Sequence, residues 1–286
     1  MIGQKAASWT LFVLLALIWG SSFILIKKGT EQLSGVQIGA LRIFSAGIVF
    51  LPVGLLHIRK LPRSKVPLVL LTGVLGNLFP AFLFAIAIEE KIESSLAGIL
   101  NSLTPLFVIL IGVTFFKAKI QYKKILGVIV GFIGLLVLSV TKGPVTGSNI
   151  GFTLLILLAT VCYGLNVNLV GTYLKGLDPI KMSTVSVGFL AIPTAFVLWL
   201  NPVSFSTEEL RHSIFSVIAL GLLGSAAATV IFYALIKKAG GLFASLVTYA
   251  IPIVAIFWGL LYGENVGIVQ FACLGIILVG VYLTNK

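Results

Sequence analysis

The chain consists of long apolar runs that are separated by short polar gaps. Each run approaches or reaches the roughly 20 apolar residues that a helix needs to cross a bilayer. The runs cover residues 8–26, 36–56, 67–88, 94–116, 123–140, 150–171, 180–200, 213–236, 240–262 and 266–283. Even the longest gap between them is too short for a soluble domain. The sequence therefore predicts an all-α integral membrane protein with ten transmembrane helices.

The composition argues against a soluble fold. Of the 286 residues, 59% are hydrophobic and only 10% are charged, so a soluble chain would lack the charged exterior that folded proteins need. On a soluble protein, the formal net charge of +12 would suggest nucleic acid. Here the charges lie between the apolar runs and leave no basic face. We therefore expect membrane lipid around the protein and no nucleic-acid partner.

The sequence contains none of the motifs or residue clusters that are typical of an enzyme or a metal site. Cys162 and Cys273 lie inside apolar runs, where they resemble small apolar residues more than a disulfide or a metal site. His57 and His212 lie in loops far apart in the sequence. There is no phosphate-binding glycine loop, no H-E-x-x-H motif and no pair of carboxylates within a run. We expect neither an enzyme nor a cofactor or metal site.

One run in each half of the chain carries the same stripe of small and polar residues. In the run 94–116 the stripe positions are 4, 3, 4 and 7 residues apart, which places them on one helix face. The same spacing returns 147 residues later. The two stripes are Ser94, Gly98, Asn101, Pro105 and Gly112, and Gly241, Ser245, Thr248, Pro252 and Gly259. Two stripes in register indicate an internal repeat.

The repeat divides the chain into two five-helix units. We expect residues 1–141 to form the first unit, residues 142–149 a linker and residues 150–286 the second unit. Five is an odd number of crossings, so the second unit is predicted to be inverted relative to the first. Inverted repeats allow a transporter to present one site to each side of the membrane in turn.

The basic residues in the gaps predict the orientation of the chain. With the N-terminus inside, the inside segments hold 14 basic residues and the outside segments hold 5. Positively charged loops stay on the cytoplasmic side of a membrane. We therefore expect a multi-pass protein of the cytoplasmic (inner) membrane with both termini in the cytoplasm.

Arg42 is the one charged side chain well inside a predicted span, about 9 Å along its helix from the outer end. An intramembrane charge costs at least about 2.5 kcal/mol on insertion scales, so Arg42 is expected to face a polar cavity or a partner. One interpretation is an anchor for an anionic group such as a substrate carboxylate. The alternative is that Arg42 extends to the outer interface, or pairs with a helix C-terminus or a loop glutamate.

Other polar residues in the runs have a binding and a packing interpretation. Asn101 and Thr248 on the stripes are candidates for a cavity, because a polar group that faces lipid is costly. Pro105 and Pro252 each free one carbonyl for a hinge or a substrate contact. Small residues at helical spacing otherwise indicate close helix packing, which alone would explain Gly98.

The first helix and its counterpart in the second unit carry similar local sequences. The segment Trp19-Gly20-Ser21-Ser22-Phe23 corresponds to Tyr163-Gly164-Leu165-Asn166. An aromatic ring beside glycine and polar groups can line a binding site with both stacking area and hydrogen bonds. An ordinary interhelical contact would account for the same residues.

With these motifs the chain resembles the ten-helix EamA-type members of the drug/metabolite transporter superfamily. The resemblance covers both halves and rests on residues 19–23, on Leu41-Arg42, on the two proline-containing stripes and on Gly263-Glu264. The first half departs from the family pattern, because Lys117 stands where the family usually has the glutamate that Glu264 supplies in the second half. The resemblance implies a cavity lined by helices 1, 3, 4, 6, 8 and 9, with helices 5 and 10 at the periphery.

The resemblance also implies a secondary carrier, commonly an exporter of amino acids or other small metabolites. We expect a transporter that moves a small organic solute outward by alternating access, with no obligatory protein partner. One alternative is an importer or antiporter of another class, such as a nucleotide sugar, a vitamin or a drug. A second is a non-transporting membrane scaffold, although a scaffold needs no internal symmetry.

The residues with a predicted role fall into two groups. The candidate substrate contacts are Trp19, Ser21, Ser22, Arg42, Asn77, Asn101, Tyr163, Asn166, Thr248 and Tyr249. The candidate hinge or packing residues are Gly20, Gly98, Pro105, Gly164, Ser245 and Pro252.

The predicted orientation can be tested by labelling single cysteines with an impermeant thiol reagent. In a background that lacks Cys162 and Cys273, a cysteine at Lys65 should react only from the cytoplasm and a cysteine at Glu90 only from the outside. Labelling of both positions from one side would contradict the topology and, with it, the inverted repeat.

Overall fold

The structure is a computed structural model that describes residues 2–90, 92–118, 147–264 and 266–285, together with positions 126, 127, 129, 130, 133, 134 and 137. Within these residues no strand is present, as the apolar runs predict. The α-helices are α1 (Ile2–Gly29), α2 (Gly35–His57), α3 (Val66–Gly73), α4 (Phe79–Glu89), α5 (Ser94–Asn101), α6 (Thr104–Phe116), α8 (Gly147–Leu169), α9 (Pro179–Gly188), α10 (Ala191–Leu200), α11 (Glu208–Ala219), α12 (Ala228–Ala239), α13 (Gly241–Ser245), α14 (Val247–Leu261) and α15 (Ile268–Asn285). Wider π-type turns continue three of the spans, namely η3 (Val74–Leu78), η4 (Val170–Leu174) and η5 (Leu220–Ala227). Two short 3₁₀ turns, η1 (Ile58–Lys60) and η2 (Arg63–Lys65), lie in the loop after α2.

Eight helical segments of the described chain are long and apolar enough to cross a membrane. They are Ala7–Gly29, Gly35–Lys60, Arg63–Glu89, Ser94–Phe116, Ile150–Leu174, Pro179–Leu200, Glu208–Ala239 and Gly241–Leu261. Each of these coincides with one predicted run, and α15 coincides with the tenth. The fifth run, 123–140, falls outside the continuously described residues. The all-α membrane fold is confirmed, whereas the count of ten stays a prediction.

Three of the described spans are interrupted within their length, and one of these breaks separates α9 from α10. α5 ends at Asn101 and α6 begins at Thr104, because Pro105 has no N–H to donate and its ring clashes with the carbonyl four residues earlier. In the second half the interruption falls at Leu246, between α13 and α14, and Pro252 lies inside α14. The equivalent prolines therefore do not place the breaks at equivalent positions, a difference that the matching stripes did not predict.

Glycines allow α2 to approach α9 and α10 closely. A Cβ atom added at Gly54 in α2 would lie 2.5 Å from the carbonyl oxygen of Thr184 in α9. A Cβ atom at Gly47 would lie 2.8 Å from the backbone nitrogen of Ala191 in α10. Helix association in lipid depends on such close packing, since the lipid tails are as apolar as the side chains. A larger residue at these positions would force the helices apart.

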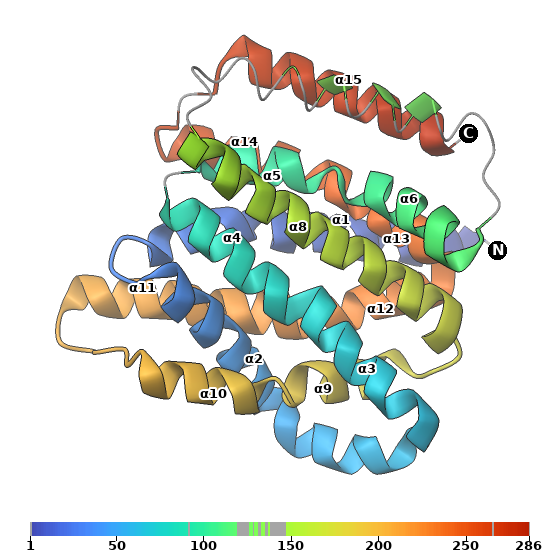
Figure 1. The fold of residues 1–286 in the computed structure, drawn as a ribbon, viewed down its shortest axis with the longest axis horizontal. Coiled ribbons are helices and arrows are strands. Elements are labelled where there is room, and N and C mark those ends of the chain that lie inside the picture. The colour runs from blue at the N-terminus through green and yellow to red at the C-terminus, as the bar shows by residue number, and fades with distance from the viewer. Residues whose placement is uncertain are drawn as a thin grey trace.

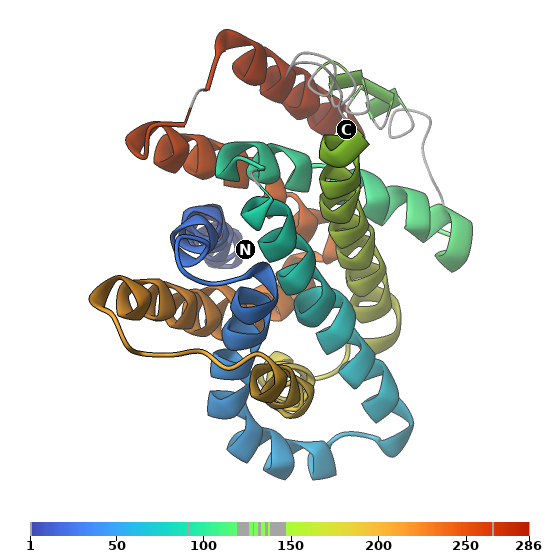
Figure 2. The same cartoon turned by 60° about the vertical axis from the view of Figure 1, so that its left-hand side comes forward.

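The helices of the two halves are interleaved rather than separated. α1 packs against α14, and α8 packs against α6. The predicted repeat relates the first pair to the second, because α8 is the counterpart of α1 and α6 is the counterpart of α14. In Figures 1 and 2, α15 lies at one edge of the bundle, beyond α14, while α9 and α10 lie at the opposite edge. The start of α1 and the end of α15 lie at the same end of the molecule (Figure 1). α8 begins inside the segment 142–149 that was predicted as a linker.

Glu264, in the loop between α14 and α15, binds the N-terminus of α5. Its carboxylate accepts hydrogen bonds from the backbone nitrogens of Ser94 (3.1 Å) and Ser95 (3.0 Å) and from the Ser94 hydroxyl (2.6 Å). It also forms a 3.0 Å ion pair with Lys27 at the end of α1. A negative charge here satisfies free N–H groups and interacts favourably with the helix dipole. Glu264 therefore joins α1, α5 and the loop after α14.

These contacts determine the ionisation of Glu264. Burial by itself would raise the pKa of this carboxyl, but the hydrogen bonds from Ser94, Lys27 and Ser95 outweigh it. They lower the pKa of Glu264 from its ordinary value of 4.5 to about 2. The carboxylate is therefore charged throughout the physiological pH range.

Replacement of Gly54 by alanine should destabilise the protein. The added methyl group would collide with the backbone of α9, and overpacking of this kind typically costs about 1–3 kcal/mol. The apparent melting temperature in detergent should fall. Gly151→Ala is the matched control, because a Cβ at Gly151 in α8 meets nothing within 4 Å and alanine favours the helix. Equal stability of the two variants would contradict the close packing of α2 on α9.

The Glu264→Gln variant tests the charged cap. A folded-state pKa of about 2 against 4.5 means that the ionised carboxyl contributes stability, about 3 kcal/mol, at pH values above 4.5. This contribution is lost as the pH falls towards 2. The melting temperature of Glu264→Gln should thus lie below that of the wild type at pH 7, and the gap should narrow on acidification. Glu31→Gln, which alters an exposed carboxylate in the turn after α1, is the control and should show no comparable gap. A constant gap between pH 7 and pH 3 would refute this role of the charge.

Candidate functional site

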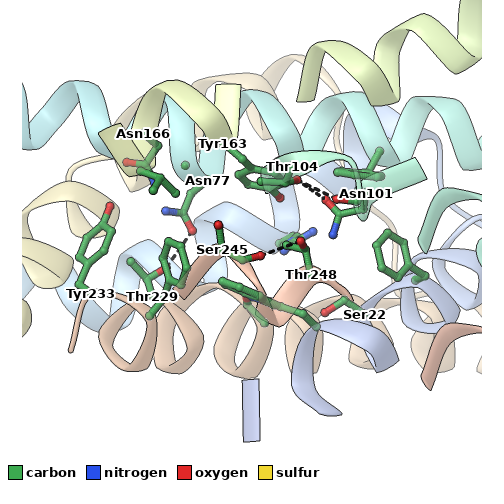
Figure 3. A pocket seen from close by; sticks show the side chains of 18 of the residues that line it. Ser22, Asn77, Asn101, Thr104, Tyr163, Asn166, Thr229, Tyr233, Ser245 and Thr248 are labelled. Atoms are coloured by element: carbon green, nitrogen blue, oxygen red, sulfur yellow. Dashed lines mark hydrogen bonds between the residues drawn. The ribbon is translucent and has the colours of Figure 1, made fainter. Parts of the chain in front are cut away.

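A cavity lies between the two halves of the chain, and polar side chains follow its length (Figure 3). Its walls come from α1, from η3 and α4, from α5 and α6, from α8, from η5 and α12, and from α13 and α14. These are the spans that the family resemblance implied. α2 adds one further side chain, Arg42.

Arg42 extends from α2 to the cavity and is only 8% exposed. Its Nε donates a 2.9 Å hydrogen bond to Oγ of Ser225, which orients the guanidinium group. Within the described residues, no hydrogen-bond acceptor lies at the two terminal nitrogens and no carboxylate pairs with the side chain. A guanidinium group has five N–H donors, and the fork of its terminal nitrogens matches the two oxygens of a carboxylate. The buried terminal donors are therefore available to an anionic ligand.

Hydroxyl groups along the cavity can act as hydrogen-bond acceptors. Ser22, Thr104 and Thr248 each donate to a carbonyl oxygen three or four positions earlier in the chain, at 3.0, 2.8 and 2.8 Å. Because each O–H is used in this way, the oxygen lone pairs remain as acceptors. These residues can therefore accept hydrogen bonds from a ligand without leaving a donor unsatisfied.

Aromatic rings form the apolar part of the walls. Phe84 and Tyr163 stack with ring centroids 6.3 Å apart, and Trp19 meets Phe232 edge-on at 5.1 Å. Trp19 also donates a 3.0 Å hydrogen bond from Nε1 to the carbonyl oxygen of Gly224, which fixes the indole ring. Apolar walls with a few well-placed polar groups are typical of small-molecule sites.

A group of amide and hydroxyl side chains occupies one end of the cavity. The Thr229 hydroxyl lies between two acceptors, the carbonyl oxygen of Ser225 and Oδ1 of Asn77, and its 3.0 Å contact with Asn77 links the two halves of the chain. Asn166 and Tyr233 lie beyond this pair in Figure 3 and are 3% and 2% exposed. This end of the cavity is therefore polar but carries no formal charge on these four side chains.

The structure brings together most of the predicted substrate contacts. The residues of that group that line the cavity are Trp19, Ser22, Arg42, Asn77, Asn101, Tyr163, Asn166 and Thr248. Ser21 and Tyr249 do not line it. Oγ of Ser21 instead accepts a 2.9 Å hydrogen bond from Nε1 of Trp258. Tyr249 packs with Ile99 and Cys273 in a separate cluster on the side of α15.

The predicted hinge or packing residues also differ in where they lie. A Cβ atom at Gly20 or Gly98 would come within 2.5 or 2.6 Å of a side chain of α14, and one at Gly164 within 2.9 Å of a side chain of α6. These glycines therefore occupy close helix contacts. Ser245, by contrast, lines the cavity.

Thr229 and Tyr233 in α12 line the cavity as well, although the sequence analysis did not single them out. A signal for them was present in the sequence. Ser225, Thr229 and Tyr233 follow one another at intervals of four residues, so they share one helix face. A polar stripe of this kind in an apolar run points to a cavity or a helix contact.

The sequence matches the family model that is described as the EamA-like transporter family, over residues 7–140 and again over residues 151–286. An "Uncharacterized transporter" of Archaeoglobus fulgidus is 26% identical over 286 residues, with 97% of this chain and 98% of that protein covered. The "Uncharacterized inner membrane transporter YedA" of Escherichia coli K12 is 27% identical, with 95% of this chain and 88% of YedA covered.

Two further proteins are similar to this chain, one in the sequence of part of the chain and one in the fold. A "Probable amino-acid metabolite efflux pump" of Salmonella typhimurium is 32% identical over 133 residues, which cover 45% of this chain and 41% of that protein. A solved structure described as "Crystal structure of protein" superposes with a TM-score of 0.69 at 16% identity and covers 97% of this chain and 96% of its own. At that identity the structural match shows the fold alone.

Proposed function

This chain belongs to the EamA-like transporter family, and we propose that it exports a small organic solute that carries a carboxylate, by alternating access across the cytoplasmic membrane. That it is a multi-pass membrane transporter follows from the family and from the apolar helices. The direction of transport and the class of solute are the parts that we propose.

The buried guanidinium of Arg42 carries the proposal. A positive charge in the interior of a membrane protein is costly without a compensating partner. The described residues supply one neutral acceptor, the Ser225 hydroxyl oxygen, and no carboxylate. An anionic ligand would neutralise the charge and use the free terminal donors. A substrate carboxylate is therefore the group that best fits the Arg42 side of the cavity.

The relatives support a metabolite as cargo and export as direction. The Salmonella typhimurium relative is named a probable amino-acid metabolite efflux pump, and the match to it extends over less than half of this chain. An amino acid or a related metabolite satisfies the requirement for a carboxylate. Aromatic and hydroxyl groups around Arg42 would hold the remainder of such a molecule.

Transport can be measured by counterflow in proteoliposomes with a panel of radiolabelled amino acids, carboxylic acids, nucleotide sugars and cationic drugs. We expect exchange with carboxylate-bearing solutes and none with cations, because the cavity lining contains an arginine and no acidic side chain among the described residues. Exchange with cations only, or with no solute at all, would contradict the proposed cargo.

Arg42→Ala should abolish most of the binding without preventing insertion into the membrane. A hydrogen bond to a charged group contributes about 1.5–3 kcal/mol, so the affinity for the best carboxylate of the panel should fall about 10- to 100-fold. Arg42→Lys should recover only part of it, because a point charge replaces a planar fork. Titration calorimetry on purified protein would measure both variants.

Arg211→Ala, which removes an exposed charge, serves as the control and should bind like the wild type. Should the Arg42→Ala protein be stable and monodisperse with unchanged affinity, Arg42 would not be the anchor.

A further inference from the structure

Two buried polar atoms at one end of the cavity have no hydrogen-bond partner among the described residues. They are Oδ1 of Asn166 and the hydroxyl oxygen of Tyr233. Their side chains are 3% and 2% exposed, and both residues line the cavity. Buried polar atoms are nearly always hydrogen-bonded in folded proteins, and leaving one unpaired costs about 1–3 kcal/mol. An unpaired acceptor beside an unpaired hydroxyl therefore requires an explanation.

The surroundings of these atoms are polar and uncharged. Thr72, Ser186 and Asn166 lie within reach of the Tyr233 hydroxyl, yet none of them forms a hydrogen bond of good geometry with it. Gly76 provides room for the Asn166 side chain, because a Cβ atom there would lie 2.5 Å from Nδ2. The missing side chain at Gly76 therefore lets the Asn166 amide pack directly against η3.

This end of the cavity is distant from Arg42. A terminal nitrogen of Arg42 lies next to Gly224, 3.8 Å from the position of an added Cβ. Tyr233 follows nine residues later on the same span, which corresponds to about 13 Å along a helix. Figure 3 shows Asn166 and Tyr233 at one end of the row of polar side chains and Ser22, which also adjoins Gly224, at the other. The cavity thus has a charged region and a separate neutral one.

We propose that Asn166 and Tyr233 form a second subsite, which binds an uncharged group that both donates and accepts hydrogen bonds, such as a carboxamide, at the end of the substrate remote from its carboxylate. Oδ1 of Asn166 accepts from the N–H of this group, and the Tyr233 hydroxyl donates to its carbonyl oxygen. The proposal rests on the proposed function, since it places the carboxylate at Arg42.

The chemistry of the subsite disfavours substrates that carry a different chemical group at the end remote from the carboxylate. An ammonium group would find no carboxylate among the described lining residues to neutralise it. A second carboxylate would meet the acceptor oxygen of Asn166, and a methyl group would leave both polar atoms unpaired. Discrimination against an analogue that lacks the hydrogen-bonding group is strong when the site's own polar groups are then left buried and unpaired.

Two matched pairs of ligands test this subsite by titration calorimetry on the purified full-length protein. The pairs are L-glutamine with L-norleucine, and glutaramate with hexanoate. Within each pair the chain length is the same and the carboxamide is replaced by an apolar end. Wild-type protein should bind the carboxamide member of each pair more tightly.

Tyr233→Phe removes only the hydroxyl and keeps the ring. The affinity for L-glutamine and glutaramate should fall about 2- to 12-fold, the range expected for one neutral hydrogen bond, while the affinity for L-norleucine and hexanoate stays unchanged. Asn166→Leu should show the same selective loss. Tyr249→Phe, which alters a buried tyrosine outside the cavity, is the control and should bind all four ligands like the wild type.

Failure of the second subsite can be distinguished from failure of the carboxylate anchor. Equal affinity of the wild type within both pairs, or no binding of any of the four, would overturn the subsite. An equal loss of all four ligands in Tyr233→Phe would overturn it too. If all four bind with similar affinity and all are lost in Arg42→Ala, the proposed function stands without the second subsite. If binding persists in Arg42→Ala, the anchor itself is refuted.

Discussion

The structure depends on the high cost of exposing polar groups to hydrocarbon. Lipid can satisfy neither a hydroxyl, nor an amide, nor a charge, so such side chains must meet inside the bundle or remain at its ends. Arg42, Asn77, Asn101 and Asn166 come from different helices, yet all are buried and line one cavity. The large exposed residues are mostly apolar. The same physical rule thus produces the apolar exterior and the polar interior.

The second requirement is that the helices pack closely without closing this cavity. Glycines such as Gly54 bring backbones into contact at the edge of the bundle, where no ligand space is needed. Around the cavity, two spans are interrupted near Asn101 and near Leu246. Interrupted helices release backbone groups where they line a cavity and provide points at which half-helices can tilt.

The two halves share a pattern but differ in their polar chemistry. Glu264 occupies the space beside Gly259 and binds the start of α5. The matching glycine of the first half, Gly112, instead faces the amide oxygen of Asn168. Lys117, which stands at the position equivalent to Glu264, cannot supply a carboxylate to the start of α13 as Glu264 does to the start of α5.

The sequence by itself determined the membrane class and the positions of the described spans, because these depend on the length and polarity of continuous segments. It left open whether Arg42 faces a cavity or extends to the outer interface, and the tertiary structure places this side chain at the cavity, 8% exposed. Only the tertiary structure decided which of two neighbouring residues faces the cavity. Ser22 lines it and Ser21 does not, since adjacent residues of a helix point about 100° apart. Likewise Tyr233 lines the cavity whereas Tyr249 packs against α15. Such choices depend on partners more than a hundred residues away, which no local pattern contains.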